Sequence, residues 1–214
     1  RNIINTMFSQ MNEINGGASR PKNIEKNPVK KLGVLGAGMM GQGIAYASAI
    51  AGIDVVLLDV SIDAAHKGKA YSEGLLAKAV EKGRMTAEKQ AATLARIKPT
   101  ADYADLQGAD LIVEAVFESV DLKSDVTKKA EPCLAEGGVF ATNTSTLPIT
   151  LLSKAASRPD NFIGIHFFSP VDKMPLVEII CGEKTSDYAL AKAFDYARQI
   201  GKTPIVVNDS LGFF

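Results

Sequence analysis

A glycine-rich turn between two apolar stretches constrains this chain more than any other feature. Gly36–Gly41 reads Gly-Ala-Gly-Met-Met-Gly, which is the pattern G-x-G-x-x-G. It follows the apolar run Leu32–Leu35 and precedes the small, apolar stretch Ile44–Ala51. The first glycine permits a tight turn, the second lets the backbone approach a pyrophosphate, and the third lets helix and strand pack closely. The pattern therefore predicts a strand, a turn and a helix whose N-terminus binds a dinucleotide.

An acidic residue after the next apolar run indicates which dinucleotide. Val55–Leu58 predicts a second strand, and Asp59 follows it directly. A carboxylate at this point accepts hydrogen bonds from an adenosine ribose and repels a 2′-phosphate, so we expect NAD rather than NADP. A glycine turn that serves packing alone is the alternative. The candidate cofactor residues of this region are Gly36, Gly38, Met39, Met40, Gly41 and Asp59.

Charge and composition limit the classes of partner. The 214 residues carry 24 basic and 24 acidic side chains, so the formal net charge is zero, which argues against nucleic acid as the main partner. No apolar run approaches the roughly 20 residues of a membrane span. The two cysteines, Cys133 and Cys181, form no metal or redox pattern. We expect a cytoplasmic protein with reduced thiols, no membrane span and no metal.

Residues 1–30 differ from the rest of the chain. Apolar side chains between Ile3 and Ile14 fall on one helical face, and a polar stretch with two prolines follows Gly16-Gly17. A short helix of this kind needs a surface to cover its apolar stripe. We therefore expect residues 1–30 to be a linker helix and linker from a preceding domain, and residues 31–214 to be the NAD-binding domain.

From Lys31 onward, predicted strands alternate with predicted helices. The strands are expected at residues 32–35, 55–58, 95–99, 110–116, 139–142, 162–168, 176–180 and 204–207, and the helices at 44–51, 61–82, after 86, at 120–134 and at 187–200. The strands are near-continuous apolar runs, which indicates helices on both faces. The pattern predicts an α/β fold, a Rossmann-type, doubly wound and mostly parallel sheet.

One connection is too short for a parallel crossover. Only residues 169–175 separate two predicted strands, whereas a parallel connection needs a dozen or more residues. The second strand should therefore run antiparallel to the first, near the C-terminal part of the sheet. If the loop is symmetric, His166 lies opposite Glu178, within reach of a hydrogen bond.

Two groups could carry chemistry beside a nicotinamide. The imidazole of His166 could remove a hydroxyl proton near neutral pH, and Glu178 could hold the ring in one tautomer. A histidine that is only a satisfied core residue is the alternative. Ser145 follows the strand expected at 139–142 and could bind a substrate oxygen, although an ordinary turn or helix cap explains it equally well. The other histidine, His66, lies in a charged helix and is interpreted as a surface residue.

Taken together, these motifs resemble the NAD-binding domain of 3-hydroxyacyl-CoA dehydrogenases. The resemblance covers Lys31 to Phe214, and residues 1–30 resemble the linker helix of the multifunctional alpha subunit of the bacterial fatty-acid oxidation complex. The segments that carry it are the glycine motif, Val113–Glu118 followed by Lys123, Asn143-Thr144-Ser145, and His166-Phe167-Phe168 with Glu178.

The resemblance implies oxidation of 3-hydroxyacyl-CoA to 3-ketoacyl-CoA with NAD, in fatty-acid beta-oxidation and in a complex with a thiolase subunit. It implies that His166 is the general base, that Glu178 is its partner and that Ser145 contacts both the substrate hydroxyl and the cofactor. The remaining implied contacts are Met40, Asp59, Val116, Glu118, Lys123 and Ser169 for NAD, and Lys82 for the coenzyme A phosphates.

The chain departs from the family pattern at two places. Ser169 stands where the family usually has asparagine, and the sequence stops at Gly212-Phe213-Phe214, before a family asparagine and a C-terminal helical domain. We therefore expect that domain to be absent and the 214 residues alone to have little turnover. Two other functions remain open. Another 3-hydroxyacid dehydrogenase would use a lysine base from the later domain, and a non-catalytic NAD-binding module would use no base.

Overall fold

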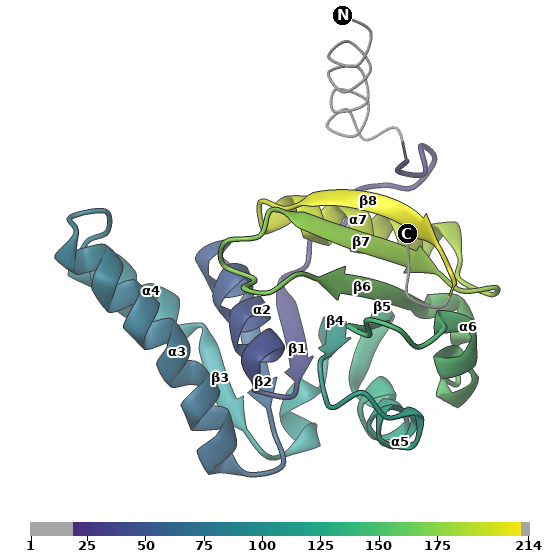
Figure 1. The fold of residues 1–214 in the computed structure, drawn as a ribbon, viewed down its shortest axis with the longest axis horizontal. Coiled ribbons are helices and arrows are strands. Elements are labelled where there is room, and N and C mark those ends of the chain that lie inside the picture. The colour runs from purple at the N-terminus through teal and green to yellow at the C-terminus, as the bar shows by residue number, and fades with distance from the viewer. Residues whose placement is uncertain (1–18, 211–214) are drawn as a thin grey trace, which may run out of the picture.

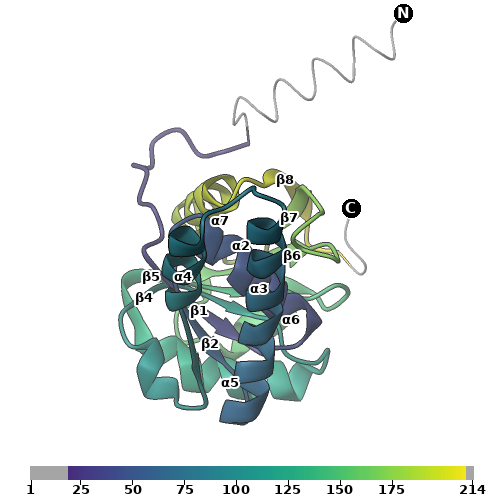
Figure 2. The same cartoon turned by 90° about the vertical axis from the view of Figure 1, so that its left-hand side faces the viewer.

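Eight strands form one sheet in residues 19–210, the part of the chain that the computed structural model describes. Their order is β3-β2-β1-β4-β5-β6-β7-β8, and helices cover both faces of the sheet (Figures 1 and 2). All neighbouring strands are parallel except the pair β6 and β7. The predicted α/β fold, with an antiparallel strand near the C-terminal part, is confirmed. The helix predicted between residues 3 and 14 lies outside the described residues.

The element bounds follow the sequence pattern closely. The strands are β1 (Lys31–Leu35), β2 (Asp54–Leu58), β3 (Ile97–Thr100), β4 (Ala109–Glu114), β5 (Leu134–Thr142), β6 (Phe162–Phe167), β7 (Leu176–Cys181) and β8 (Thr203–Asn208). The α-helices are α2 (Met39–Ile50), α3 (Ile62–Glu81), α4 (Ala87–Ala95), α5 (Val120–Ala130), the short α6 (Ile149–Leu152) and α7 (Asp187–Gln199).

Two elements end two or more residues before the predicted position, each for a local reason. The strand expected at 110–116 ends at Glu114, because the Glu114 carboxylate accepts a hydrogen bond from the Val116 amide and removes it from the sheet ladder. The helix expected at 120–134 ends at Ala130, and a short 3₁₀ turn containing Pro132 follows. Proline lacks the amide that would continue the helix, and β5 therefore begins earlier than expected.

Both faces of the sheet are buried, as the continuous apolar runs indicated. In strands β1, β2 and β4 to β7, residues on opposite faces enter two separate core clusters, so Val34 of β1 belongs to one and Leu35 to the other. Residues of α2 and α7 complete the first cluster, whereas residues of α5 and α6 complete the second. The packed sheet thus fixes the positions of the loops at its strand ends, where functional residues commonly lie.

Residues 19–30 contact α7 at both ends of the segment. The Arg20 guanidinium donates from Nε and Nη2 to the two carboxylate oxygens of Asp195, each at 2.7 Å. Near the other end, Val29 exchanges two hydrogen bonds with the Gln199 side-chain amide, at 3.0 and 2.9 Å. The segment interpreted as a linker therefore lies against the domain rather than away from it.

The glycine motif brings α2 very close to β1. Gly36 has a φ of +91°, a conformation that costs other residues energy. A Cβ atom built on Gly41 would lie 1.7 Å from the Gly36 carbonyl oxygen, so only glycine fits there. A Cβ on Gly38 would meet nothing within 4 Å and would project into open space. The turn thus combines a tight packing contact with an accessible backbone.

We expect Gly41→Ala to lower the free energy of unfolding by about 3 kcal/mol or more, because the methyl group forces α2 away from β1. Gly74→Ala is the matched control. A Cβ there meets nothing within 4 Å, so alanine should stabilise α3 by about 0.5–1 kcal/mol. Urea unfolding followed by circular dichroism measures both. Equal stabilities of Gly41→Ala and wild type would contradict the close approach of α2 and β1.

Candidate active site at the carboxyl edge of the sheet

A cavity of about 540 Å³ opens beside the glycine turn. Strand β1 lies between β2 and β4, so the chain order reverses at this point, and ligands of doubly wound sheets bind at such a reversal. Four of the predicted cofactor residues line the cavity, namely Gly36, Gly38, Asp59 and Val116. The sequence analysis did not single out the rest of its wall, which includes Val60, Ala101, Tyr103, Phe117, Leu122 and Val126.

The Asp59 carboxylate is fixed by two backbone amides. Its Oδ2 atom accepts a hydrogen bond from the Ala37 amide at 2.6 Å, and its Oδ1 atom accepts one from the Val60 amide at 2.7 Å. Each carboxylate oxygen can accept a second hydrogen bond. Asp59 therefore has two roles: it anchors the glycine turn to β2, and it retains acceptor capacity toward the cavity.

Lys123 is completely buried, which the sequence did not indicate. Its side chain is 1% exposed, and its ammonium lies 2.8 and 3.1 Å from the two carboxylate oxygens of Glu114. It also lies 3.2 Å from a carboxylate oxygen of Glu118 and 3.4 Å from the Val116 carbonyl oxygen. A buried charge needs such compensation. In this arrangement Lys123 binds protein oxygens and joins the ends of β4 and α5.

Glu118 holds the turn that carries Ser145. One carboxylate oxygen accepts hydrogen bonds from the Thr144 hydroxyl, from the Ser145 amide at 3.0 Å and from the Thr146 amide at 3.3 Å. Burial raises the pKa of Glu118, but the hydrogen bond from Thr144 and the charge of Lys123 outweigh it and lower that pKa below its ordinary value. The turn after β5 is therefore positioned by a negative charge from the loop after β4.

The predicted antiparallel register of β6 and β7 is confirmed. His166 lies opposite Glu178, and its Nδ1 atom is 2.7 Å from the Glu178 Oε2 atom. The imidazole is 16% exposed and the carboxylate 7%. Against a carboxylate, Nδ1 must be the donor, so the basic lone pair of the neutral ring is at Nε2. The ring also contacts Phe168, with centroids 4.8 Å apart.

Asn143 connects the ends of β5 and β6. Its side-chain oxygen accepts a hydrogen bond from the Phe167 amide at 2.9 Å, which ties the end of β5 to the end of β6. Asn143 is 8% exposed, so this bond is well shielded from water. The sequence analysis used Asn143 only as part of a motif, because an asparagine after a strand is also common in ordinary turns.

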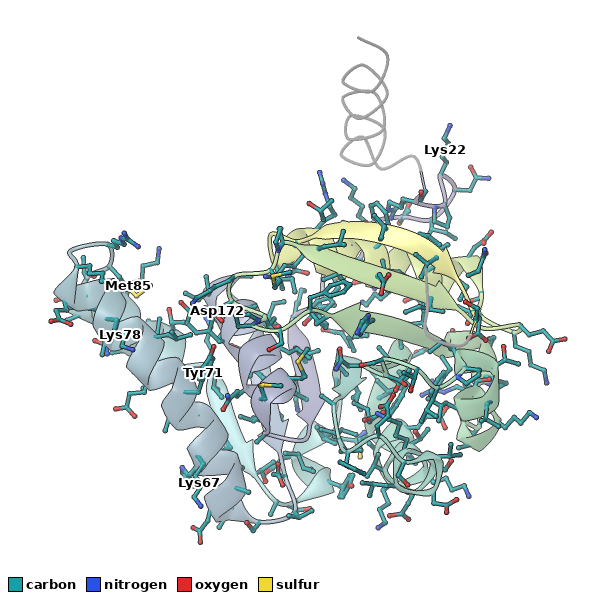
Figure 3. All side chains as sticks on the ribbon, in the orientation of Figure 1. Lys22, Lys67, Tyr71, Lys78, Met85 and Asp172 are labelled. Atoms are coloured by element: carbon teal, nitrogen blue, oxygen red, sulfur yellow. The ribbon has the colours of Figure 1, made fainter. Side chains whose placement is uncertain are left out.

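The remaining candidates lie at different distances from this cluster. Ser145 is exposed in its turn, and the Ser169 hydroxyl contacts the Met39 sulfur at 3.7 Å at the start of α2. Met40 and Gly41 occupy the first turn of α2. Lys82, by contrast, is exposed at the C-terminal end of α3, the part of that helix that extends away from the sheet beyond Lys78 in Figure 3. The structure does not bring Lys82 to the others.

The candidate residues come together because the loops that carry them lie at the same edge of the sheet. The loops after β1, β2, β4, β5 and β6 meet there, and the dyad residue Glu178 joins them from the antiparallel β7. The arrangement offers a cavity beside the glycine turn, an imidazole oriented by a carboxylate and an exposed hydroxyl. Within residues 19–210 no cluster of His, Cys, Asp or Glu is arranged for a metal. None of the helices of that region has the length and apolar content that a bilayer crossing requires.

Comparisons with known proteins agree with this description. The family described as "3-hydroxyacyl-CoA dehydrogenase, NAD binding domain" matches residues 31–210. The fatty acid oxidation complex subunit alpha of Pseudomonas entomophila is 49% identical over 185 residues, which are 86% of this chain but only 26% of that protein. The chain therefore spans about a quarter of the length of this curated relative.

Solved structures show the same fold. (S)-3-hydroxybutyryl-CoA dehydrogenase PaaH1 of Ralstonia eutropha is 42% identical with a TM-score of 0.83, over 86% of this chain and 65% of that one. 3-Hydroxybutyryl-CoA dehydrogenase of Escherichia coli is 31% identical with a TM-score of 0.82, over 86% of this chain and 39% of that one.

The lowered pKa of Glu118 makes the stability pH-dependent. A carboxylate whose pKa is lower in the folded state stabilises the fold above its unfolded pKa, and this contribution is lost as the pH falls through the folded pKa. Glu118→Gln should therefore be less stable than wild type at neutral pH and lose less stability on acidification below about pH 4.5. Urea unfolding across this range measures the effect.

The exposed carboxylate Glu136 on β5 provides the control, and Glu136→Gln should keep the wild-type pH dependence. If Glu118→Gln also kept the wild-type pH dependence, the negative charge of Glu118 would add nothing to the hydrogen bonds that the Ser145 turn donates to it.

Proposed function

This chain belongs to the 3-hydroxyacyl-CoA dehydrogenase family and represents its NAD-binding domain, and from that membership we propose that it carries the cofactor site and the general base for oxidation of 3-hydroxyacyl-CoA to 3-ketoacyl-CoA. The observation that carries the proposal is the 2.7 Å pair of His166 and Glu178 at the sheet edge that also holds the cavity. Turnover of acetoacetyl-CoA and NADH by the full-length protein tests it.

The residues present fit NAD. The open space beside Gly38 leaves room for a pyrophosphate, and the amides at the start of α2 face that space with the positive end of the helix dipole. Asp59 has acceptor capacity for ribose hydroxyls, and the apolar wall of the cavity suits an adenine ring. When bound, the nicotinamide accepts the hydride from C3 of the substrate.

His166 would take the proton of the C3 hydroxyl at Nε2 as the hydride leaves. The Glu178 carboxylate orients the ring and stabilises the imidazolium that forms, in a site where neither side chain is more than 16% exposed. Ser145 would hydrogen-bond the substrate oxygen, and Glu118 fixes the turn that presents it. We propose that Val116 and Ser169 contact the cofactor, whereas Lys123 supports the site from within the protein.

The two other readings make different demands. A 3-hydroxyacid dehydrogenase with a lysine base does not require the pairing of His166 and Glu178, and a non-catalytic module requires no oriented base. The buried and hydrogen-bonded pair of His166 and Glu178 therefore favours the 3-hydroxyacyl-CoA dehydrogenase over both alternatives. Acetoacetyl-CoA turnover separates the three, because a non-catalytic module would bind NADH without consuming it.

A larger assembly is a second part of the proposal. The relative of this chain in Pseudomonas entomophila is named as the alpha subunit of a complex, which supports a protein partner. We propose a thiolase subunit as that partner, since thiolysis consumes the 3-ketoacyl-CoA that this reaction forms. Co-purification of the full-length protein with its partner would test this. The cytoplasmic location stays a prediction from the sequence.

We expect Asp59→Asn to narrow the preference for NADH over NADPH, because it removes the charge that repels a 2′-phosphate. The asparagine oxygen can still accept the Ala37 amide, so the glycine turn should remain anchored. Asp54→Asn, at the opposite end of β2, is the control and should leave the ratio of the two dissociation constants unchanged. Calorimetric titration of NADH and of NADPH into wild type and into each variant measures the three ratios. An Asp59→Asn protein with the wild-type ratio would show that Asp59 does not select the cofactor.

We expect His166→Ala to lower kcat of the full-length protein by about 10²–10⁴, the usual range for a general base. NADH affinity should hardly change, because the cavity contacts come from other elements. Glu178→Gln keeps the side-chain shape and should also lower kcat, since it weakens the orientation and stabilisation of the ring. Steady-state kinetics measures both, with the exposed His66→Ala as the control. Full turnover by His166→Ala would place the base elsewhere.

A further inference from the structure

The loop between the two dyad strands, residues 168–175, is held from three sides. It connects β6, which carries His166, to β7, which carries Glu178, and it includes Ser169. Within the loop, the amides of Lys173 and Met174 both donate to the Pro170 carbonyl oxygen at 3.0 Å.

A buried lysine, Lys202, binds the backbone of the loop. The Lys202 ammonium donates hydrogen bonds to the Val171 carbonyl oxygen and to the Met174 carbonyl oxygen, the latter at 2.7 Å. Lys202 is 9% exposed and stands directly before β8. Burial lowers the pKa of Lys202, so the protein bears a cost for keeping an ammonium here. An apolar side chain would pack without that cost but could not bind the two carbonyl groups.

The loop is also seated on α2. Val171 is 2% exposed and lies over Gly43, where an added Cβ atom would come within 2.8 Å of the Val171 Cβ. Helix α2 begins at Met39, next to the pyrophosphate space, and Ser169 contacts the Met39 sulfur. The position of the loop therefore relates the dyad strands to the helix that starts at the cofactor site.

A third contact ties the loop to α3. The Tyr71 hydroxyl donates to the Asp172 carboxylate at 2.8 Å, and Figure 3 shows the two side chains meeting between α3 and the loop. Desolvation and this hydrogen bond raise the pKa of Tyr71 to about 12. Below that pH the tyrosine is a neutral donor to the loop.

We propose that Lys202 is a positioning residue for the dehydrogenase reaction. By binding two carbonyl groups of the 168–175 loop, it seats Val171 on Gly43 and thereby sets His166 and Ser169 relative to the N-terminus of α2. This role rests on the proposed function. It differs from the role of the dyad, because Lys202 acts on the loop backbone and not on the substrate or the cofactor.

The chain offers a closely matched control. Lys192 of α7 is 4% exposed, and burial lowers its pKa as it does that of Lys202. The charges of Asp110 and Asp195 act on Lys192 in the opposite direction and raise its pKa, and both residues lie outside the 168–175 loop. Lys192→Met and Lys202→Met therefore make the same chemical change at buried sites, but only the second removes the loop contact.

The first measurement needs neither cofactor nor substrate. Hydrogen exchange at the Lys173 and Met174 amides should become faster in Lys202→Met and stay as in wild type in Lys192→Met. The second measurement is the maximal turnover rate of the full-length protein. Dividing this rate by the number of NADH-binding sites found by titration gives kcat per binding site. We expect a loss of about 10²-fold for Lys202→Met, the cost of a displacement of about 1 Å, with little change in NADH affinity. Lys192→Met should keep the wild-type value.

A loss of folded protein alone would not change kcat per binding site, so this ratio separates positioning from stability. Wild-type exchange and kcat in Lys202→Met, or an equal loss in Lys192→Met, would overturn the proposal. Turnover by the wild-type protein tests the proposed function. The ratio of kcat per binding site between variant and wild type tests the positioning role of Lys202, so failure of one proposal is distinguished from failure of the other.

A second pair of variants decides the case if Lys202→Met does not fold. Gly43→Ala pushes on Val171 from α2 without changing Lys202, whereas Gly74→Ala adds the same methyl group to α3 in open space. Gly43→Ala should speed exchange at Lys173 and Met174 and lower kcat per NADH-binding site, and Gly74→Ala should do neither. Wild-type kcat in Gly43→Ala would show that the seat of the loop on α2 does not matter, and the proposal would fail.

Discussion

The close approach of α2 to β1 is the constraint on which the rest of the site depends. Because a Cβ on Gly41 would lie 1.7 Å from the Gly36 carbonyl oxygen, the helix can start against the strand only with glycine at that position. The same approach exposes the backbone at Gly38 and brings the Ala37 amide to the Asp59 carboxylate. A packing contact inside the protein thus exposes the backbone that we propose binds the pyrophosphate.

Charge inside the protein then organises the loops around that surface. Lys123 holds Glu114 and Glu118, and Glu118 in turn holds the turn of Ser145. Breaking a buried ion pair leaves an uncompensated charge, which costs several kcal/mol, so such a network resists rearrangement. Lys202 acts in a similar way on the 168–175 loop, but through carbonyl groups. Two buried lysines therefore fix two of the loops that face the proposed reaction.

The sequence predicts those parts of the structure that are set by pattern and chain length. Apolar runs located the strands, and the short connection at residues 169–175 required the antiparallel pair in which His166 faces Glu178. The burial of Lys123 could not be predicted in this way, because its partners lie at different spacings along the chain and a lysine is ordinarily exposed unless it is paired. The contacts of Lys202 with a loop distant in sequence carry no local pattern either.

We propose that His166 removes the proton of the C3 hydroxyl while Glu178 orients the imidazole. A crystal structure of the full-length protein with NADH and acetoacetyl-CoA measures this most directly, as the distance from the His166 Nε2 atom to the C3 oxygen. We expect this distance to lie within hydrogen-bond reach, about 2.6–3.2 Å, with the bond between Nδ1 and Glu178 intact. A C3 oxygen held by another ionisable side chain, with His166 out of reach, would contradict it.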